Sequence, residues 1–252
     1  MHSQTLRARS VSELVDAAFS LYRRDASQYI MVTAIAVVPG LIAQLILLRP
    51  AGDVSLGASL GALGVSLISM VTYALMTGVV TRMGSDVYLG SEADVATAVR
   101  SVLPKTGSLV AAGIMRAILY VLFFLLLVFP VFYAFARWFA PEAAVVLEDK
   151  DSGEALSRSS DLTDGFRWHV LRTLLLGYGI YFLLGIAIGI VGAVSDSQVV
   201  ALFVQTVFTV IAYPIVGLLT MLLYYDLRIR KEGFDVEHLS RALGDVSARP
   251  AR

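Results

Sequence analysis

Three ionisable side chains stand inside long apolar stretches of the sequence and are its first candidates for chemistry: Arg116, Arg137 and Glu142. A charge at the centre of a membrane helix costs on the order of 3 kcal/mol, so a charge at such a position usually serves binding, transport or helix pairing. Together these three residues would form a polar pocket for an anionic lipid headgroup or substrate. In the other interpretation, Arg116 and Glu142 lie at similar depth and pair to fix helix register, while Arg137 extends toward lipid headgroups.

A second group of polar residues follows the last long apolar run, and it predicts both anchoring and docking. Tyrosines suit the headgroup layer, and basic residues suit an anionic inner leaflet. The charges of this motif alternate in sign, so we also expect them to pair with other helices on the cytoplasmic side. The residues of this candidate docking motif are Tyr224, Tyr225, Asp226, Arg228, Arg230 and Glu232.

The rest of the sequence offers little for catalysis or metal binding. The chain has no cysteine, which excludes thiol nucleophiles, thiolate metal sites and disulfides. Its three histidines, His2, His169 and His238, are scattered, and no recognisable motif places a base beside a nucleophile. The 20 basic residues balance the 20 acidic ones, which argues against nucleic-acid binding. We therefore predict that the protein is not an enzyme and carries no metal or cofactor.

The composition indicates that lipid surrounds the elements that carry these residues. Of the 252 residues, 57% are hydrophobic and 16% are charged, whereas a soluble domain has about 25% charged residues. A helix needs about 20 apolar residues to cross the hydrocarbon core, and the runs 26–48, 54–81, 173–195 and 197–225 satisfy this length. The region 106–147 is interrupted by charges and fits either one tilted span or a hairpin of two.

An internal repeat favours the hairpin. Three short amphipathic helices are predicted at 10–24, 91–103 and 151–162, and their starts carry capping pairs. The first and third are each followed by two spans, so the second should be followed by two as well. These would be 106–128 and 132–147, with a turn near 129–131. Charge placement agrees, because six crossings put seventeen basic residues on one side and Arg49 alone on the other.

The predicted fold is therefore an all-α integral membrane bundle of six transmembrane helices in three amphipathic-helix-plus-hairpin repeats. Residues 1–246 form a single polytopic membrane domain, and 247–252 form a disordered tail. Both termini lie in the cytoplasm and the spans lie in the inner (cytoplasmic) membrane.

Small residues and prolines inside the spans leave further alternatives open. The four-residue spacings of Gly57 with Gly61 and of Gly185 with Gly189 suit close helix packing, either within one bundle or along a homodimer seam. Pro39 and Pro214 lie inside spans, where proline marks either an ordinary kink or a broken helix of the kind that binds substrates in transporters.

Three segments resemble a known family once this layout is drawn: SVSELVDAAFSLYRRD at 10–25, EALSRSSDLTDGFRWHVLRTLL at 154–175 and LLYYDLRIRKEGFDVEHL at 222–239. They are similar to the bacterial membrane domain named for glycerophosphoryl diester phosphodiesterases. In the enzymes of that family, a separate α/β-barrel domain with a His-Arg pair performs the chemistry. No histidine of this chain is followed by arginine, so the resemblance implies a stand-alone membrane domain without the catalytic one.

The sequence thus predicts a non-catalytic polytopic membrane protein, a scaffold or accessory subunit that acts through membrane lipids and a protein partner or second copy. The alternative is a transporter or lipid-handling protein that uses the polar pocket of Arg116, Arg137 and Glu142. Nucleic acid is not expected as a partner.

Overall fold

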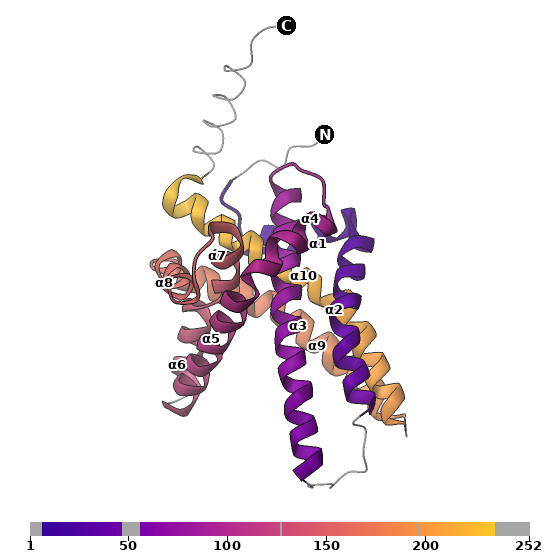
Figure 1. Cartoon of the computed structure of the whole chain (residues 1–252). Coiled ribbons are helices and arrows are strands. Elements are labelled where there is room, and N and C mark those ends of the chain that lie inside the picture. The colour runs from indigo at the N-terminus through magenta and orange to yellow at the C-terminus, as the bar shows by residue number, and fades with distance from the viewer. Residues whose placement is uncertain (1–6, 47–55, 127, 196, 235–252) are drawn as a thin grey trace, which may run out of the picture.

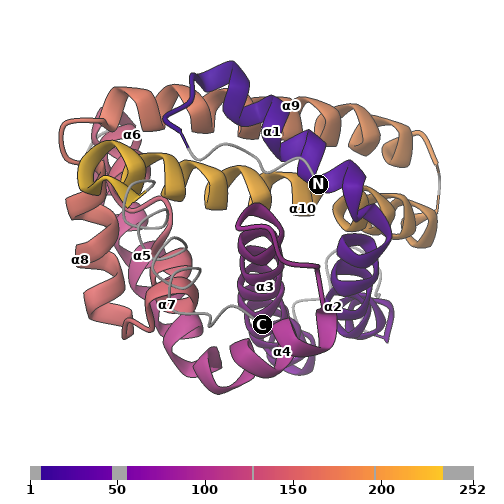
Figure 2. The ribbon, with the colours of Figure 1, turned by 90° about the horizontal axis from the view of Figure 1, so that it is seen from above.

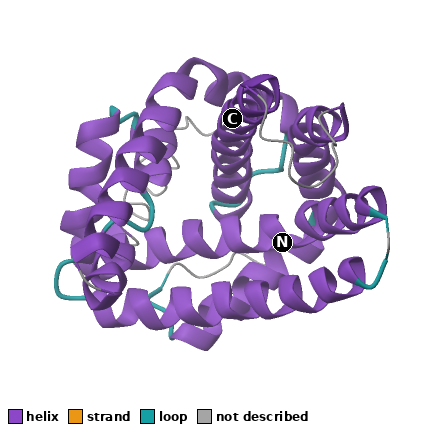
Figure 3. Ribbon diagram, turned by 90° about the horizontal axis from the view of Figure 1, so that it is seen from below, coloured by secondary structure: helices purple, strands orange, loops and turns teal. Residues whose placement is uncertain are grey.

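The computed structural model describes residues 7–46, 56–126, 128–195 and 197–234, and over this part the chain is helical with no strand (Figures 1 and 3). The predicted tail at 247–252, Arg49, and the outer ends of several predicted spans lie outside the described residues. The helices are α1 (Val11–Arg24), α2 (Ala26–Ile46), α3 (Leu56–Tyr88), α4 (Val95–Val102), α5 (Thr106–Leu126), α6 (Val128–Arg137), α7 (Pro141–Glu148), α8 (Ser152–Thr163), α9 (Arg167–Ala193) and α10 (Gln198–Glu232), with a 3₁₀ turn, η1 (Leu103–Lys105), between α4 and α5.

Within the described residues, five helical segments are long and apolar enough to cross a membrane. They are Ala26–Leu45, Ser59–Tyr88, Val95–Leu125, Arg167–Ala193 and Gln198–Glu232. The protein is therefore all-helical and has the composition of an integral membrane bundle, as predicted.

The fourth of the six predicted spans, 132–147, is not confirmed as a single helix. The chain there forms two short helices, α6 and α7, separated at Trp138 to Ala140. Proline at position 141 explains the break, since the ring of a proline disfavours helical backbone angles in the residue before it. Ala140 accordingly has φ −141° and ψ 48°, and Pro141 starts the next helix.

Both ends of the region 106–148 lie together. Lys105, just before α5, donates a hydrogen bond of 3.0 Å from Nζ to the carbonyl of Val146 in α7. It also forms an ion pair with Asp149, the residue that follows α7. Because α5 leaves this point and α7 comes back to it, the region enters and leaves on the same side of the bundle (Figure 1).

Short helices lie at the three positions predicted to be amphipathic, with one different start. Ser10 and Glu13 form the full capping box of α1, and Asp151 caps α8 at Glu154. The second helix begins at Val95 rather than near Ser91, because Asp94 is its N-cap and accepts from the backbone N–H groups of residues 96 and 97.

Two of the short helices pack chiefly on helices that precede them in the chain. α4 packs on α3, and α8 packs on α5 and α7. α1 instead lies across α9 and α10, which come much later in the sequence (Figure 2). We call these three helices the elbow layer. Their apolar faces are buried against the long helices, as Leu14 and Leu21 of α1 show.

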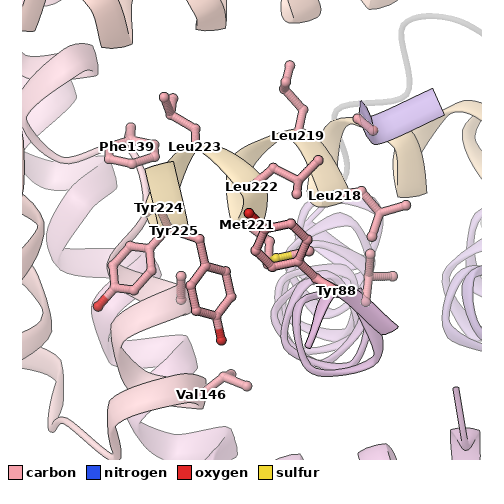
Figure 4. Close-up of a cluster of buried hydrophobic side chains, with 14 of the residues drawn as sticks. Tyr88, Phe139, Val146, Leu218, Leu219, Met221, Leu222, Leu223, Tyr224 and Tyr225 are labelled. Carbon is pink, nitrogen blue, oxygen red and sulfur yellow. The ribbon is translucent and has the colours of Figure 1, made fainter. Parts of the chain in front are cut away.

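The core lies beneath the elbow layer, around the C-terminal half of α10. The buried residues there are Leu218, Met221, Leu222, Tyr224 and Tyr225. They lie beside Tyr88 of α3, Phe139 between α6 and α7, and Val146 of α7 (Figure 4). Side chains of this half of α10 bond to α3, α7, α8 and α9, so it positions the polar groups described next.

Candidate functional site

Arg116 of α5 and Glu142 of α7 form a two-bonded ion pair inside the bundle. Arg116 Nη1 lies 2.6 Å from Glu142 Oε2, and Nη2 lies 2.5 Å from Oε1. The Glu142 side chain is 9% exposed and the Arg116 side chain 26%. Paired guanidinium and carboxylate planes are the strongest side-chain ion pairs, and each charge here neutralises the other. The structure thus brings together the two residues that the sequence placed at similar depth.

An open cleft of about 610 Å³ adjoins this pair. Its walls are α3 and α5, which diverge away from α4 (Figure 1). Met70, Ala74, Ile114 and Leu122 are typical of its lining, which is almost entirely apolar. Gly113 lies in the α5 wall, and a Cβ atom added there would meet nothing within 4 Å.

The few polar groups in the cleft are already bonded to one another. Besides the Arg116–Glu142 pair, the hydroxyl groups of Tyr213 in α10 and Thr77 in α3 lie 2.7 Å apart. Burying a polar group without a partner costs on the order of 1–3 kcal/mol. Since these groups have partners, the cleft can hold an apolar molecule without leaving them unsatisfied.

Arg137 does not join this pair, contrary to the three-residue pocket expected from the sequence. It ends α6 and donates a 2.7 Å hydrogen bond from Nε to Ser160 of α8. Its guanidinium lies 5.1 Å from the ring centre of Trp138 and 5.9 Å from that of Tyr133. The turn of the chain into α7 and α8 carries Arg137 to the α8 side of α6, away from the α3–α5 cleft.

The elbow helix α8 satisfies the backbone groups freed by the break between α6 and α7. Ser159 donates to the carbonyl of Arg137 at 3.2 Å and accepts from the N–H of Ala140 at 3.4 Å. Tyr120 of α5 donates to the carbonyl of Trp138 at 3.0 Å. Such partners allow a broken helix to persist among membrane spans.

The docking motif on α10 is occupied by contacts within the chain. Asp226 is 2% exposed and accepts three hydrogen bonds: from the N–H of Arg9 at 2.6 Å, from His169 Nε2 at 2.9 Å and from Arg230 Nε at 2.7 Å. Arg230 also donates to the carbonyl of Arg9 at 2.5 Å. This carboxylate thus connects the segment before α1, the start of α9 and the end of α10.

A second polar network lies beside it and connects α7, α8 and α10. Arg158 of α8 donates to Glu148 at 2.8 and 2.9 Å and to Glu232 at 2.5 and 2.9 Å. Tyr224 donates to Glu148 at 2.7 Å, and Arg228 Nε lies 3.4 Å from the same carboxylate. Burial alone would raise the pKa of Glu148, but the bonds from Arg158 and Tyr224 outweigh it and hold this pKa below the ordinary value for glutamate.

The remaining member of the motif, Tyr225, bonds to α3. Its hydroxyl group lies 2.7 Å from that of Ser85, and its ring packs against Tyr88. The partners that the sequence did not identify are the N–H of Arg9, Ser85, Glu148, Arg158 and His169. Two of them could have been found from charge: Glu148 lies just before α8 and Arg158 lies within it, and the two residues have opposite charges.

The four glycines predicted to pack helices differ in their surroundings. A Cβ at Gly185 would lie 3.3 Å from Phe208 of α10, inside the bundle. At Gly57 and Gly189 a Cβ would meet nothing within 4 Å, and Gly61 lies in α3. Two glycines that did not stand out in the sequence also face α10: Gly177 faces the Leu219 side chain, and a Cβ at Gly192 would lie 3.3 Å from the backbone of Ala201.

Among the described residues, no three metal-ligating side chains come together. No protein-family model, curated protein or solved structure matches the chain. The function is therefore argued from the geometry.

Proposed function

We propose that the protein is a non-catalytic scaffold of a bacterial cytoplasmic membrane that holds phospholipid acyl chains in the cleft between α3 and α5. The observation that carries this proposal is the cleft itself, an apolar groove of about 610 Å³ between two spans. Phospholipid is the solvent of these spans and is always at hand to fill the groove. Its chains match the aliphatic lining at Met70, Ile114 and Leu122.

The pairing of the polar groups favours lipid over a polar solute. A pathway for a polar substrate needs side chains or backbone groups that are free to bind it. Arg116 and Glu142 are bound to each other, and Tyr213 is bound to Thr77. Pro39 and Pro214 lie within the continuous helices α2 and α10, so neither breaks its helix. These features support a scaffold more than a transporter.

We place both termini on the cytoplasmic side, with α6 and α7 together forming an interrupted return of the α5 hairpin. The contacts of Lys105 with Val146 and Asp149 support this arrangement, since they hold the two ends of the region together. The basic residues support it independently, because an even number of crossings keeps seventeen of them on one side. The three segments that resemble the glycerophosphoryl diester phosphodiesterase membrane domain support membership of that family.

Filling the cleft tests the proposal. In Gly113→Phe the new side chain enters open space in the α5 wall, so the helix should form and the groove should be blocked. Native mass spectrometry of the detergent-purified protein should show tightly retained phospholipid in the wild type and at least one fewer lipid in Gly113→Phe.

The matched control is Gly189→Phe, in which the same substitution on α9 also meets open space but lies outside the cleft. It should retain lipid as the wild type does. Equal lipid retention in all three proteins would refute the cleft as a lipid site. Capture of a second copy or another protein that only Gly113→Phe releases would replace the lipid by a protein occupant.

A further inference from the structure

A second hollow, of about 760 Å³, lies between α6 and the start of α9. Phe132 and Tyr133 line it from α6, and Arg167 and Trp168 line it from α9. It shares no lining residue with the cleft between α3 and α5. It is therefore a separate feature of the surface, and the scaffold proposal does not use it.

Two guanidinium groups lie near the Tyr133 ring: that of Arg167, which lines the hollow, and that of Arg137, which is not among the lining residues. The Arg167 guanidinium carbon lies 4.9 Å from the ring centre, and that of Arg137 lies 5.9 Å from it. Cations placed over aromatic rings are held in position while they remain able to bind an anion.

The charges at the hollow do not cancel. Arg167 pairs with Asp164 at 2.8 Å, but its buried Nε atom has no hydrogen-bond partner. Arg137 bonds to the neutral groups Ser160 and Tyr133, and within the described part of the chain no acidic side chain forms an ion pair with it. His169 also lines the hollow, but its Nε2 is bound to Asp226. Arg167 and its neighbour Arg137 thus have one acidic partner between them, so positive charge is in excess beside the hollow.

The polarity of the hollow matches that of a phospholipid. Trp168 is 72% exposed at the first turn of α9, the position that tryptophan takes at a membrane surface. Leu171 and Leu175 continue the lining along the same helix. The N-cap residue of α9, Phe166, supplies no side-chain hydrogen bond, so the first turn keeps its positive end free to favour an anion.

We propose that this hollow binds the phosphate headgroup of an anionic phospholipid through Arg167, with Arg137 adding positive charge beside the Tyr133 ring and with the lipid chains lying along Phe132, Leu171 and Leu175. The proposal requires that the chain lies in a bilayer, but it does not require the α3–α5 cleft to be occupied. Binding of lipid here would fix the start of α9 against α6.

The test measures lipid preference by native mass spectrometry. Delipidated protein receives equal amounts of phosphatidylglycerol and phosphatidylcholine with the same acyl chains. The wild type should retain phosphatidylglycerol preferentially. Because each basic residue near an anionic surface contributes a factor of about five, Arg167→Gln should lower this preference about fivefold and the double variant Arg137→Gln/Arg167→Gln about 25-fold.

Arg100→Gln is the matched control, since it removes the same charge from the exposed end of α4 and should leave the preference unchanged. Arg167→Lys keeps the charge and should retain most of the preference, which separates lost binding from lost folding. A preference that is unchanged in Arg167→Gln would overturn the proposal, as would an equal loss in Arg100→Gln. Displacement of the bound lipid by inorganic phosphate at millimolar concentration would identify a soluble anion as the ligand and would also overturn it.

The outcome is independent of the cleft experiment. Gly113→Phe should lose a lipid without changing the ratio of phosphatidylglycerol to phosphatidylcholine at the second hollow. Failure of either site therefore leaves the result for the other intact.

Discussion

The two halves of α10 are both apolar in sequence, yet they are packed differently. In the first half, Val199, Phe203 and Ile211 are 48%, 60% and 46% exposed. In the second half, Leu218 and Leu223 are fully buried, and the polar residues Tyr224 and Asp226 are buried with them. The elbow helix α1 and the helices α3 and α7 cover this second half.

The difference shows what lipid can supply and what only protein can supply. Acyl chains complete the packing of Val199 or Phe203 as well as another helix would, because both surroundings are apolar. A carboxylate such as Asp226 needs hydrogen-bond donors and neighbouring cations, and lipid chains have none. The bundle is therefore dense where its polar groups lie and open where its surface is aliphatic.

The comparison fails most clearly if the half of the bundle that carries the buried ion pairs and hydrogen bonds does not face the cytoplasm. The chain has no cysteine, so single cysteines can be introduced without a background. Glu92→Cys and Lys150→Cys should react with a membrane-impermeant maleimide only after the cells are permeabilised. Val194→Cys, at the other end of α9, should react in intact cells. Opposite accessibility of positions 92 and 150 would mean that the region between them crosses the membrane an odd number of times.

Loss of the Asp226 carboxylate should have the largest effect on stability. Asp226→Ala leaves the N–H of Arg9 and the side chains of His169 and Arg230 without their common acceptor. Removing one partner from a buried charge network costs about 3–5 kcal/mol, measured here as the free energy of unfolding in mixed detergent micelles. Glu154→Gln, which alters an exposed carboxylate of α8, should change the stability little. Equal effects of the two variants would contradict the role of Asp226.

A smaller effect is expected at Glu148, and it depends on pH. Its pKa is lowered in the folded protein, so its contribution to stability is present above the unfolded pKa of about 4.3 and is lost as the pH falls through the folded value. Glu148→Gln should lower the free energy of unfolding by about 2 kcal/mol at pH 7, the cost of weakening hydrogen bonds between charged groups. Thermal unfolding at pH 7 and pH 3 should show a smaller acid-induced loss in Glu148→Gln than in the wild type.

The helices and their caps could be predicted from the sequence because their signals are local. The capping box of Ser10 and Glu13 indicates the start of α1, and four long uncharged runs indicate four of the five helical segments that could span a membrane. The pairing of Arg116 with Glu142 followed from counting residues on either side of an expected turn. That estimate needs only the helical rise of 1.5 Å per residue.

The rest depends on contacts between distant residues, which a single sequence does not contain. The break at Pro141 persists because Ser159 and Tyr120 bond to the freed backbone groups, and neither residue stood out in the chain. Arg137 was assigned to the pocket because it lies within the same apolar region as Arg116. Its actual neighbour, Ser160, comes from a helix that follows the break.

The packing of α1 has a consequence for biogenesis. α1 leaves the ribosome before α9 and α10, yet its buried face rests on these two helices. Until α10 has been inserted, Leu14 and Leu21 lack their final partners, and the N–H of Arg9 lacks Asp226. The contacts of α1 can therefore form only after α10 is in the membrane, so a chain that stops before α10 exposes an apolar helix that quality-control proteases can recognise.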